Sequence, residues 1–118
     1  MTIAAFLEKL TQTPEAINFV ETTAVIEANY DFTPTAFENG LQHNAAGDNS
    51  GSCKLFAFAE IQNLSEAATL ACFGVYYFED VLKNPNGTDH QNIRNFMKTG
   101  WDGIAFYGSA LVLKYLNR

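Results

Sequence analysis

Residues 39–56, NGLQHNAAGDNSGSCKLF, contain a hairpin turn, a glycine-rich loop and a helix start in one short stretch. Asn39-Gly40 is a typical centre for a two-residue turn, because both turn positions need positive φ and these residue types tolerate it. The pair therefore predicts an antiparallel hairpin between residues 35–38 and 41–44. Pro34, which cannot donate a ladder hydrogen bond, is expected at the outer edge of that hairpin.

The second half of this stretch predicts a helix that carries a cysteine in its first turn. Residues 47–51 form a flexible polar loop, and Gly51-Ser52 is a candidate N-cap for a helix over residues 53–62. The unpaired N–H groups and the positive end of the helix dipole at this position favour a thiolate. Cys53 is therefore the leading candidate nucleophile.

Two helices are predicted before the hairpin. The first covers residues 2–10, with Thr2 as its cap and apolar residues at helical spacing. Thr13-Pro14-Glu15 has the order of an N-cap, a first-turn proline and a first-turn acid, so it predicts the start of the second helix. That helix is expected to end at residues 29–31 and to present one apolar face formed by Ile17, Val20, Ala24 and Ala28.

Two more helices are predicted after residue 62. Ser65 is expected to cap a helix that runs to about residue 83 and is apolar on nearly every side, which is typical of a buried central helix. Gly74 within it would allow a neighbouring segment to approach closely. After a turn at residues 84–87, Thr88 to Gln91 match a capping box that opens the last helix, and Gly100 ends it. Its predicted apolar face is His90, Ile93, Met97 and Trp101.

The C-terminal segment predicts a strand that joins the hairpin. Apolar residues alternate over residues 103–113, although residues 110–116 fit a terminal helix equally well. The expected architecture is an α+β fold, mainly helical, with about five helices and a small antiparallel sheet from residues 33–44 and 103–113. No repeat or linker divides the chain, so one domain over residues 1–118 is predicted.

Composition restricts the partners and the compartment. Lys and Arg number seven against thirteen Asp and Glu, for a net charge of −6, and the basic residues do not cluster, which argues against a nucleic-acid surface. No apolar run approaches the roughly 18 to 20 residues of a membrane span, and no leader sequence is recognisable. A cytoplasmic protein with two reduced cysteines, no cofactor and an aromatic-rich core of phenylalanines is expected.

Four motifs in order resemble the HopJ family, named after a type III effector of plant-pathogenic bacteria. They are ANYDFTPTAFENG (28–40), NSGSCK (49–54), LACFG (70–74) and GTDHQNIRNFMKTGW (87–101). The similarity covers roughly residues 19–106. It implies a HopJ type III effector-like protein, similar also to small cytoplasmic proteins of Gram-negative bacteria, and it carries over no catalytic residue.

An enzyme hypothesis rests on the cysteine. Cys53 would act as nucleophile, His43 or His90 as base, and Asp89 or Asp48 as the group that orients the histidine. In the alternative interpretation Cys53 is a small apolar core residue. The same side chains match no zinc-ligand spacing, so no metal site is predicted.

A binding hypothesis rests on the aromatic residues between 73 and 101. Tyr76, Tyr77 and Trp101, with Phe73 and Phe78, line a ligand pocket or pack in the core, and Lys54 lies beside the loop that could cradle an anion. The favoured function is a small cytoplasmic binding or interaction module for a small molecule or protein partner. A cysteine-dependent hydrolase or transferase and an exported effector acting in a host cell are the alternatives.

Overall fold

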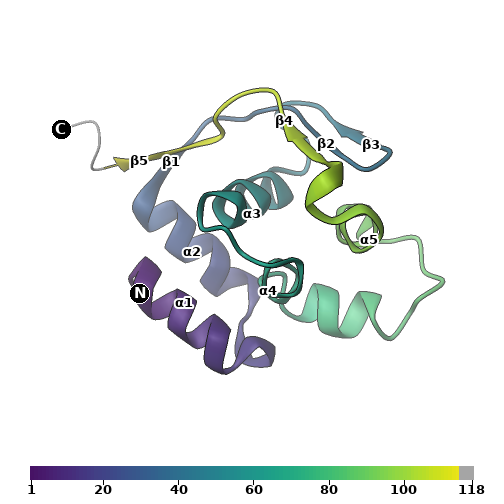
Figure 1. Cartoon of the computed structure of the whole chain (residues 1–118), viewed down its shortest axis with the longest axis horizontal. Helices are drawn as coiled ribbons and strands as arrows, with labels where there is room; N and C mark the ends of the chain where they lie inside the picture. Colours follow the sequence, from purple (N-terminus) through teal and green to yellow (C-terminus); the bar gives the residue numbers. More distant parts are fainter. Residues whose placement is uncertain (115–118) are drawn as a thin grey trace.

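Helix α3 (Ser50–Ile61) lies at the centre of the structure, with the other helices around it and the strands along one side (Figure 1). The computed structural model describes residues 1–114. Nearly every residue of α3 from Cys53 to Ala59 is buried. A helix buried on most sides forms the core of a domain, so α3 occupies the central position that was predicted for residues 65–83.

The fold is α+β, as predicted, with the elements in the following order. The α-helices are α1 (Ile3–Gln12), α2 (Phe19–Asn29), α3, α4 (Glu66–Ala71) and α5 (Gln91–Thr99). A π-helical segment, η2 (Tyr76–Val81), and two 3₁₀ turns, η1 (Pro14–Ala16) and η3 (Gly100–Gly103), complete the helical part. The strands are β1 (Tyr30–Phe32), β2 (Phe37–Asn39), β3 (Gln42–Asn44), β4 (Ile104–Phe106) and β5 (Leu111–Leu113).

The strands form two small antiparallel sheets rather than one. β2 lies between β3 and β4, with Phe37 opposite Phe106, and β1 pairs with β5. The predicted strand at residues 103–113 and its pairing with the hairpin are therefore confirmed, although its second half pairs with β1. The alternative terminal helix is wrong for residues 111–113, and residues 115 and 116 of that prediction lie outside the described residues.

The hairpin forms as predicted, but its turn is shifted by one residue. Gly40 (φ +62°) and Leu41 form the turn, whereas Asn39 ends β2 and is fully buried. The side-chain amide of Asn39 donates to the backbone oxygen of Asn92 at 2.8 Å. This contact with α5 outweighs the turn preference of asparagine. Pro34 lies before β2, in neither strand.

The first helix has its predicted cap, and the second starts later than expected. The Thr2 hydroxyl accepts from the Ala5 N–H at 3.0 Å. Thr13 and Pro14 open only the 3₁₀ turn η1, and α2 begins after Asn18, which forms a capping box with Glu21. This later start rotates the buried face of α2, which consists of Thr22, Val25 and Ile26, while the predicted Val20 is 74% exposed.

The predicted long helix over residues 65–83 is broken at Gly74. Ser65 caps α4 as expected, accepting from the Ala68 N–H at 3.1 Å. Gly74 has φ +62°, and a Cβ there would lie 3.0 Å from the Cα of Asn18. The predicted close approach is therefore confirmed, but the conformation it requires ends α4, and η2 follows with Val75 and Leu82 exposed.

Two helix starts differ from prediction in the same way. Asn49 (φ 52°) and His90 (φ 50°) precede α3 and α5 in the left-handed region, so neither Ser52 nor Thr88 is a cap. The Gln91 side chain donates instead to the Thr88 backbone oxygen. Gly100 ends α5 with φ +56°, as expected. The buried face of α5 is Asn92, Ile93, Arg94 and Phe96, and the predicted Met97 is exposed.

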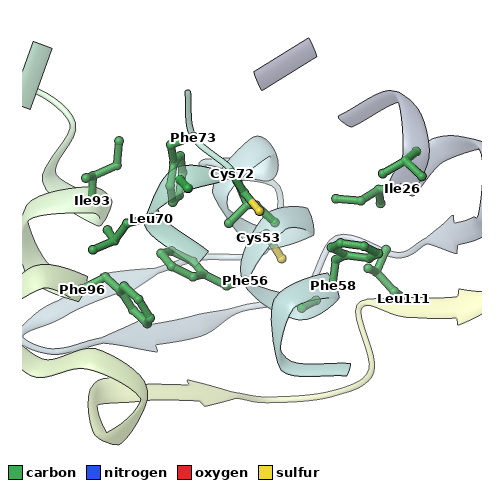
Figure 2. Close-up of a cluster of buried hydrophobic side chains, with 14 of the residues drawn as sticks. Ile26, Cys53, Phe56, Phe58, Leu70, Cys72, Phe73, Ile93, Phe96 and Leu111 are labelled. Carbon is green, nitrogen blue, oxygen red and sulfur yellow. The ribbon is translucent and has the colours of Figure 1, made fainter. Parts of the chain in front are cut away.

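Phenylalanine rings fill the core, as the composition predicted. Phe56 of α3 contacts the rings of Phe37, Phe73 and Phe96 at centroid distances of 6.1, 5.5 and 5.0 Å. Figure 2 shows Phe56 with Phe73 and Phe96. One side chain thus connects the central helix to a strand, to the turn after α4 and to α5. No helix within residues 1–114 has the length and hydrophobicity that crossing a bilayer requires.

Candidate functional site

A cleft of about 380 Å³ lies where the first turns of α3 and α5 meet an aromatic wall. Asn49, which precedes α3, and Gly51 and Ser52 of α3 line one part of the cleft, and His90, which precedes α5, and residues 91–93 of α5 line another. Gln42 of β3 and the aromatic residues Phe19, Phe73 and Tyr76 complete the lining. None of these lining residues is acidic, although the whole chain carries a net charge of −6.

Two helix N-termini open into this cleft. Neither Asn49 nor His90 caps its helix through its side chain. The first-turn N–H groups of a helix have no partner within the helix and carry the positive end of its dipole. Gly51 and Ser52 of α3 and Gln91 and Asn92 of α5 all line the cleft, so its position at two helix starts favours a negatively charged group.

The aromatic wall consists of neighbouring rings that contact one another. The Phe19 ring stacks on Phe73 at 6.2 Å and meets Tyr76 edge to face at 5.3 Å. Tyr76 in turn lies 5.1 Å from the imidazole of His90. Planar apolar groups pack well against such rings. The cleft therefore offers an apolar wall next to polar backbone groups.

His90 is flanked by two carboxylates. Its Nε2 lies 3.0 Å from Oδ2 of Asp80 and 3.9 Å from Oδ2 of Asp89. Arg94 donates to Oδ1 of Asp89 at 2.6 Å, and this hydrogen bond lowers the pKa of the Asp89 carboxyl. The sequence predicted Asp89 and His90 as site residues, and the structure brings these two together with Asp80.

A buried network of asparagines supports the floor of the cleft. Asn92 exchanges hydrogen bonds with Asn44 at 2.9 and 3.2 Å, and Asn39 donates to Oδ1 of Asn92 at 3.0 Å. Asn49 donates to Oδ1 of Asn44 at 2.8 Å. Within the described part of the chain, Oδ1 of Asn39 is buried without a hydrogen-bond partner, but the side-chain amides of Asn39, Asn44, Asn49 and Asn92 all donate within the network. Such buried hydrogen bonds hold the attached segments in one arrangement. This network therefore fixes the starts of α3 and α5 relative to the hairpin.

Cys53 is not part of the cleft. Its side chain is 2% exposed, and its thiol donates to the backbone oxygen of Thr35 at 3.4 Å. Burial raises the pKa of the Cys53 thiol, and the Thr35 hydrogen bond offsets this only in part. Within residues 1–114, no hydrogen bond links Cys53 to His43 or His90. Cys53 therefore lies in the core, without the histidine contact that would activate its thiol.

Both cysteines are expected to react slowly with iodoacetamide in the folded protein. Cys53 and Cys72 are free and buried, and burial raises the pKa of Cys72 to about 12. At pH 7.5 each thiol should react roughly a hundredfold more slowly than in the guanidinium-unfolded chain, because reaction waits for local opening. Mass spectrometry after timed quenching measures both rates. A Cys53 rate that reaches a plateau below about pH 7 would instead show an activated thiolate.

The other predicted site residues lie in separate environments. His43 of β3 is exposed and bonded to Glu38, which also accepts from the Tyr107 hydroxyl at 2.8 Å. Lys54 pairs with Glu27 at 3.3 Å. The structure therefore assembles no Cys53, His43 and Asp48 group.

Among the aromatic residues predicted to line a pocket, Phe73 and Tyr76 line the cleft. The indole N–H of Trp101 donates to the backbone oxygen of Leu64 at 2.9 Å, and its ring packs 5.1 Å from that of Phe96. Tyr77 packs beside Phe78, with 5.0 Å between the ring centroids. Trp101 and Tyr77 thus belong to the periphery of the core.

Asp80 and Arg94 were missed as site residues. Asp80 lies on η2, ten residues before His90, and no local spacing rule joins these positions. Arg94 is buried although it is charged, and its position in the sequence does not indicate this. An arginine five residues after an aspartate gave no signal that the two side chains form an ion pair.

Comparisons with known proteins give two findings. A family model described as "HopJ type III effector protein" matches residues 3–111. A crystal structure titled as that of the "unknown function protein VPA0580" is similar with a TM-score of 0.95 and 58% sequence identity, and the match covers 97% of this chain and 95% of that one. No curated protein matches the chain.

Proposed function

This chain belongs to the HopJ family, and we propose that it is a small cytoplasmic binding module whose ligand occupies the cleft between α3 and α5. The observation that carries the proposal is the meeting of two helix N-termini with an aromatic wall in one cleft of about 380 Å³. Such a cleft suits a small molecule that joins a planar apolar group to a carboxylate or phosphate.

Other clefts in the structure support this choice less well. One of about 390 Å³ runs beside Leu82, Pro85 and Met97, and among the described residues only one helix start, at Gln91 of α5, contributes to its lining. Another, of about 420 Å³, lies between α1 and α4 and includes Glu15. The α3–α5 cleft combines uncapped helix starts, an imidazole and stacked rings, which together can orient a ligand.

The burial of Cys53 supports binding rather than cysteine-dependent catalysis. A nucleophile must reach its substrate, and the Cys53 thiol is held against the Thr35 backbone inside the core. The exported effector is the second candidate, favoured by the description of the family model. The well-formed helix α1 supports a cytoplasmic module. It has a side-chain cap and buries Phe6 and Leu10.

Phenyl phosphate is expected to bind in the cleft, and benzyl alcohol is not. The first compound supplies both a ring and an anion, whereas the second lacks the charge that the helix starts favour. In ¹H–¹⁵N spectra, saturable shifts should appear at the amides of Gly51, Ser52, Gln91 and Asn92. Tyr76→Ala should weaken this binding about three- to tenfold, because it removes one aromatic contact.

Tyr107→Ala is the matched control for this experiment. Tyr107 is an exposed tyrosine that bonds to Glu38 and is not part of the cleft lining. This variant should bind phenyl phosphate as the native protein does. Shifts spread evenly over the surface, or equal losses in the two tyrosine variants, would refute a ligand site in the cleft.

A further inference from the structure

Three side chains with metal-ligating atoms meet beside the cleft. Oδ2 of Asp80, on η2, and the side chains of Asp89 and His90, just before α5, place one ligand atom each within 4.8 Å of the others. Across residues 1–114 no other group of three such side chains is this close. The residues come from two separate segments, so the packing of η2 against α5 creates the group.

The separations approach those of a metal coordination sphere. Nε2 of His90 is 3.0 Å from Asp80 and 3.9 Å from Asp89. Ligands at 2.0–2.2 Å around a tetrahedral ion lie about 3.4 Å apart. The Asp80 carboxylate is 46% exposed, so it can rotate to complete the set without disturbing the core.

Arg94 orients the Asp89 side chain through Oδ1 and does not bond to its Oδ2. It donates to Oδ1 of Asp89 at 2.6 Å and to the Asp89 backbone oxygen at 2.6 Å, and Oδ2 faces His90. Arg94 is itself held by the Asn84 backbone oxygen at 2.8 Å. Asn84 also donates to the Asp80 backbone oxygen at 3.0 Å. Outer contacts of this kind hold ligating side chains in place at metal sites.

We propose that Asp80, Asp89 and His90 bind a divalent transition-metal ion such as Zn²⁺ or Mn²⁺. An imidazole with two carboxylates suits these ions, whereas Mg²⁺ and Ca²⁺ prefer oxygen ligands alone. Two negative charges face the ion, and Arg94 offsets one of them. Because His90 also lines the cleft, the bound ion adds positive charge at its rim.

Titration with the metal alone tests this inference. Protein treated with EDTA and dialysed is titrated with ZnCl₂ by calorimetry, with the expectation of one ion per chain. Asp80→Asn should weaken binding at least about tenfold, since a neutral amide replaces a ligand. Mn²⁺ should broaden the amides of residues 80, 89 and 90 before any others. Equal affinity in native protein and Asp80→Asn would overturn the proposal.

Matched variants separate this site from weak surface binding. Glu79→Gln removes a neighbouring carboxylate that pairs only with Lys83 among residues 1–114, and it should keep native affinity. His90→Asn retains a residue type that tolerates the positive φ and should lose binding, whereas His43→Asn should not. Loss of binding in His43→Asn but not in His90→Asn would overturn the assignment.

The metal titration does not depend on binding of phenyl phosphate in the cleft. Phenyl phosphate is absent from the metal titration, and the phenyl phosphate experiment is run in EDTA. A failure of the metal proposal thus leaves ligand binding in the cleft intact, and the reverse also holds.

Discussion

Phe56→Ala is expected to lower the free energy of unfolding by about 3–5 kcal/mol, the usual cost of removing a fully buried phenylalanine. Phe56 is completely buried and contacts the rings of Phe37, Phe73 and Phe96. These partners belong to different parts of the fold, so the cavity cannot be filled by the movement of one element alone. Urea unfolding followed by circular dichroism measures the change.

Leu41→Ala is the control for this substitution. Leu41 lies in the hairpin turn and is fully exposed, so its loss should change the free energy of unfolding by less than about 0.5 kcal/mol. If Phe56→Ala lowered the free energy of unfolding no more than Leu41→Ala, the contacts of Phe56 with the three neighbouring rings would not stabilise the fold. A changed slope of the urea transition would show instead that the unfolded ensemble had changed.

Asn92→Ala is expected to cost about 2–4 kcal/mol and to disorder the cleft. The substitution removes the three side-chain hydrogen bonds that Asn92 makes with Asn39 and Asn44, each worth about 1 kcal/mol, whereas the Asn39 amide keeps its bond to the Asn92 backbone oxygen. Because the same network ties the first turn of α5 to the hairpin, phenyl phosphate affinity should fall with stability. Urea unfolding and the amide titration measure the two effects.

Asn95→Ala provides the comparison on the same helix. Asn95 is half-buried and bonds to the Gln42 side chain at 3.2 Å and to the Gln91 backbone oxygen of its own helix at 2.8 Å. Its loss should cost about 1 kcal/mol or less, since water can replace these contacts. Equal destabilisation by the two alanine variants would show that the buried network around Asn92 stabilises the fold no more than the half-buried Asn95 side chain does.

Local signals predicted the elements whose ends depend on their own residues. The Thr2 and Ser65 caps, the glycine stop at Gly100 and the hairpin itself all follow from side-chain-to-backbone bonds or backbone preference within a few residues. The alternation in residues 103–113 likewise predicted strands. Such features need no knowledge of the rest of the fold.

Positions decided by tertiary contacts were not predictable in this way. Gly74 fits a helix by sequence, but its packing against the backbone of Asn18 and Phe19 requires the conformation that breaks the helix. Asn39 was interpreted as a turn residue because its bond to Asn92 joins positions 53 residues apart. Several polar residues near each helix start compete as caps, and packing decides among them.

The candidate site shows the same division. Tyr76, Asp89 and His90 were predicted from residue type, and the structure places them at or beside the cleft. Asp80 joins them only because η2 packs against the start of α5. Cys53 had the right position on its helix for activation, but the depth of α3 in the core determines its chemistry.

The strand order has a consequence for synthesis on the ribosome. β1 pairs with β5, and β2 requires β4 as its second neighbour, so both sheets depend on residues 104–113. A nascent chain that ends before Ile104 can form helices and the β2–β3 hairpin, but an isolated two-stranded hairpin is marginal in water. Stable tertiary structure of both sheets should therefore appear in one step, only after residues 104–113 have emerged.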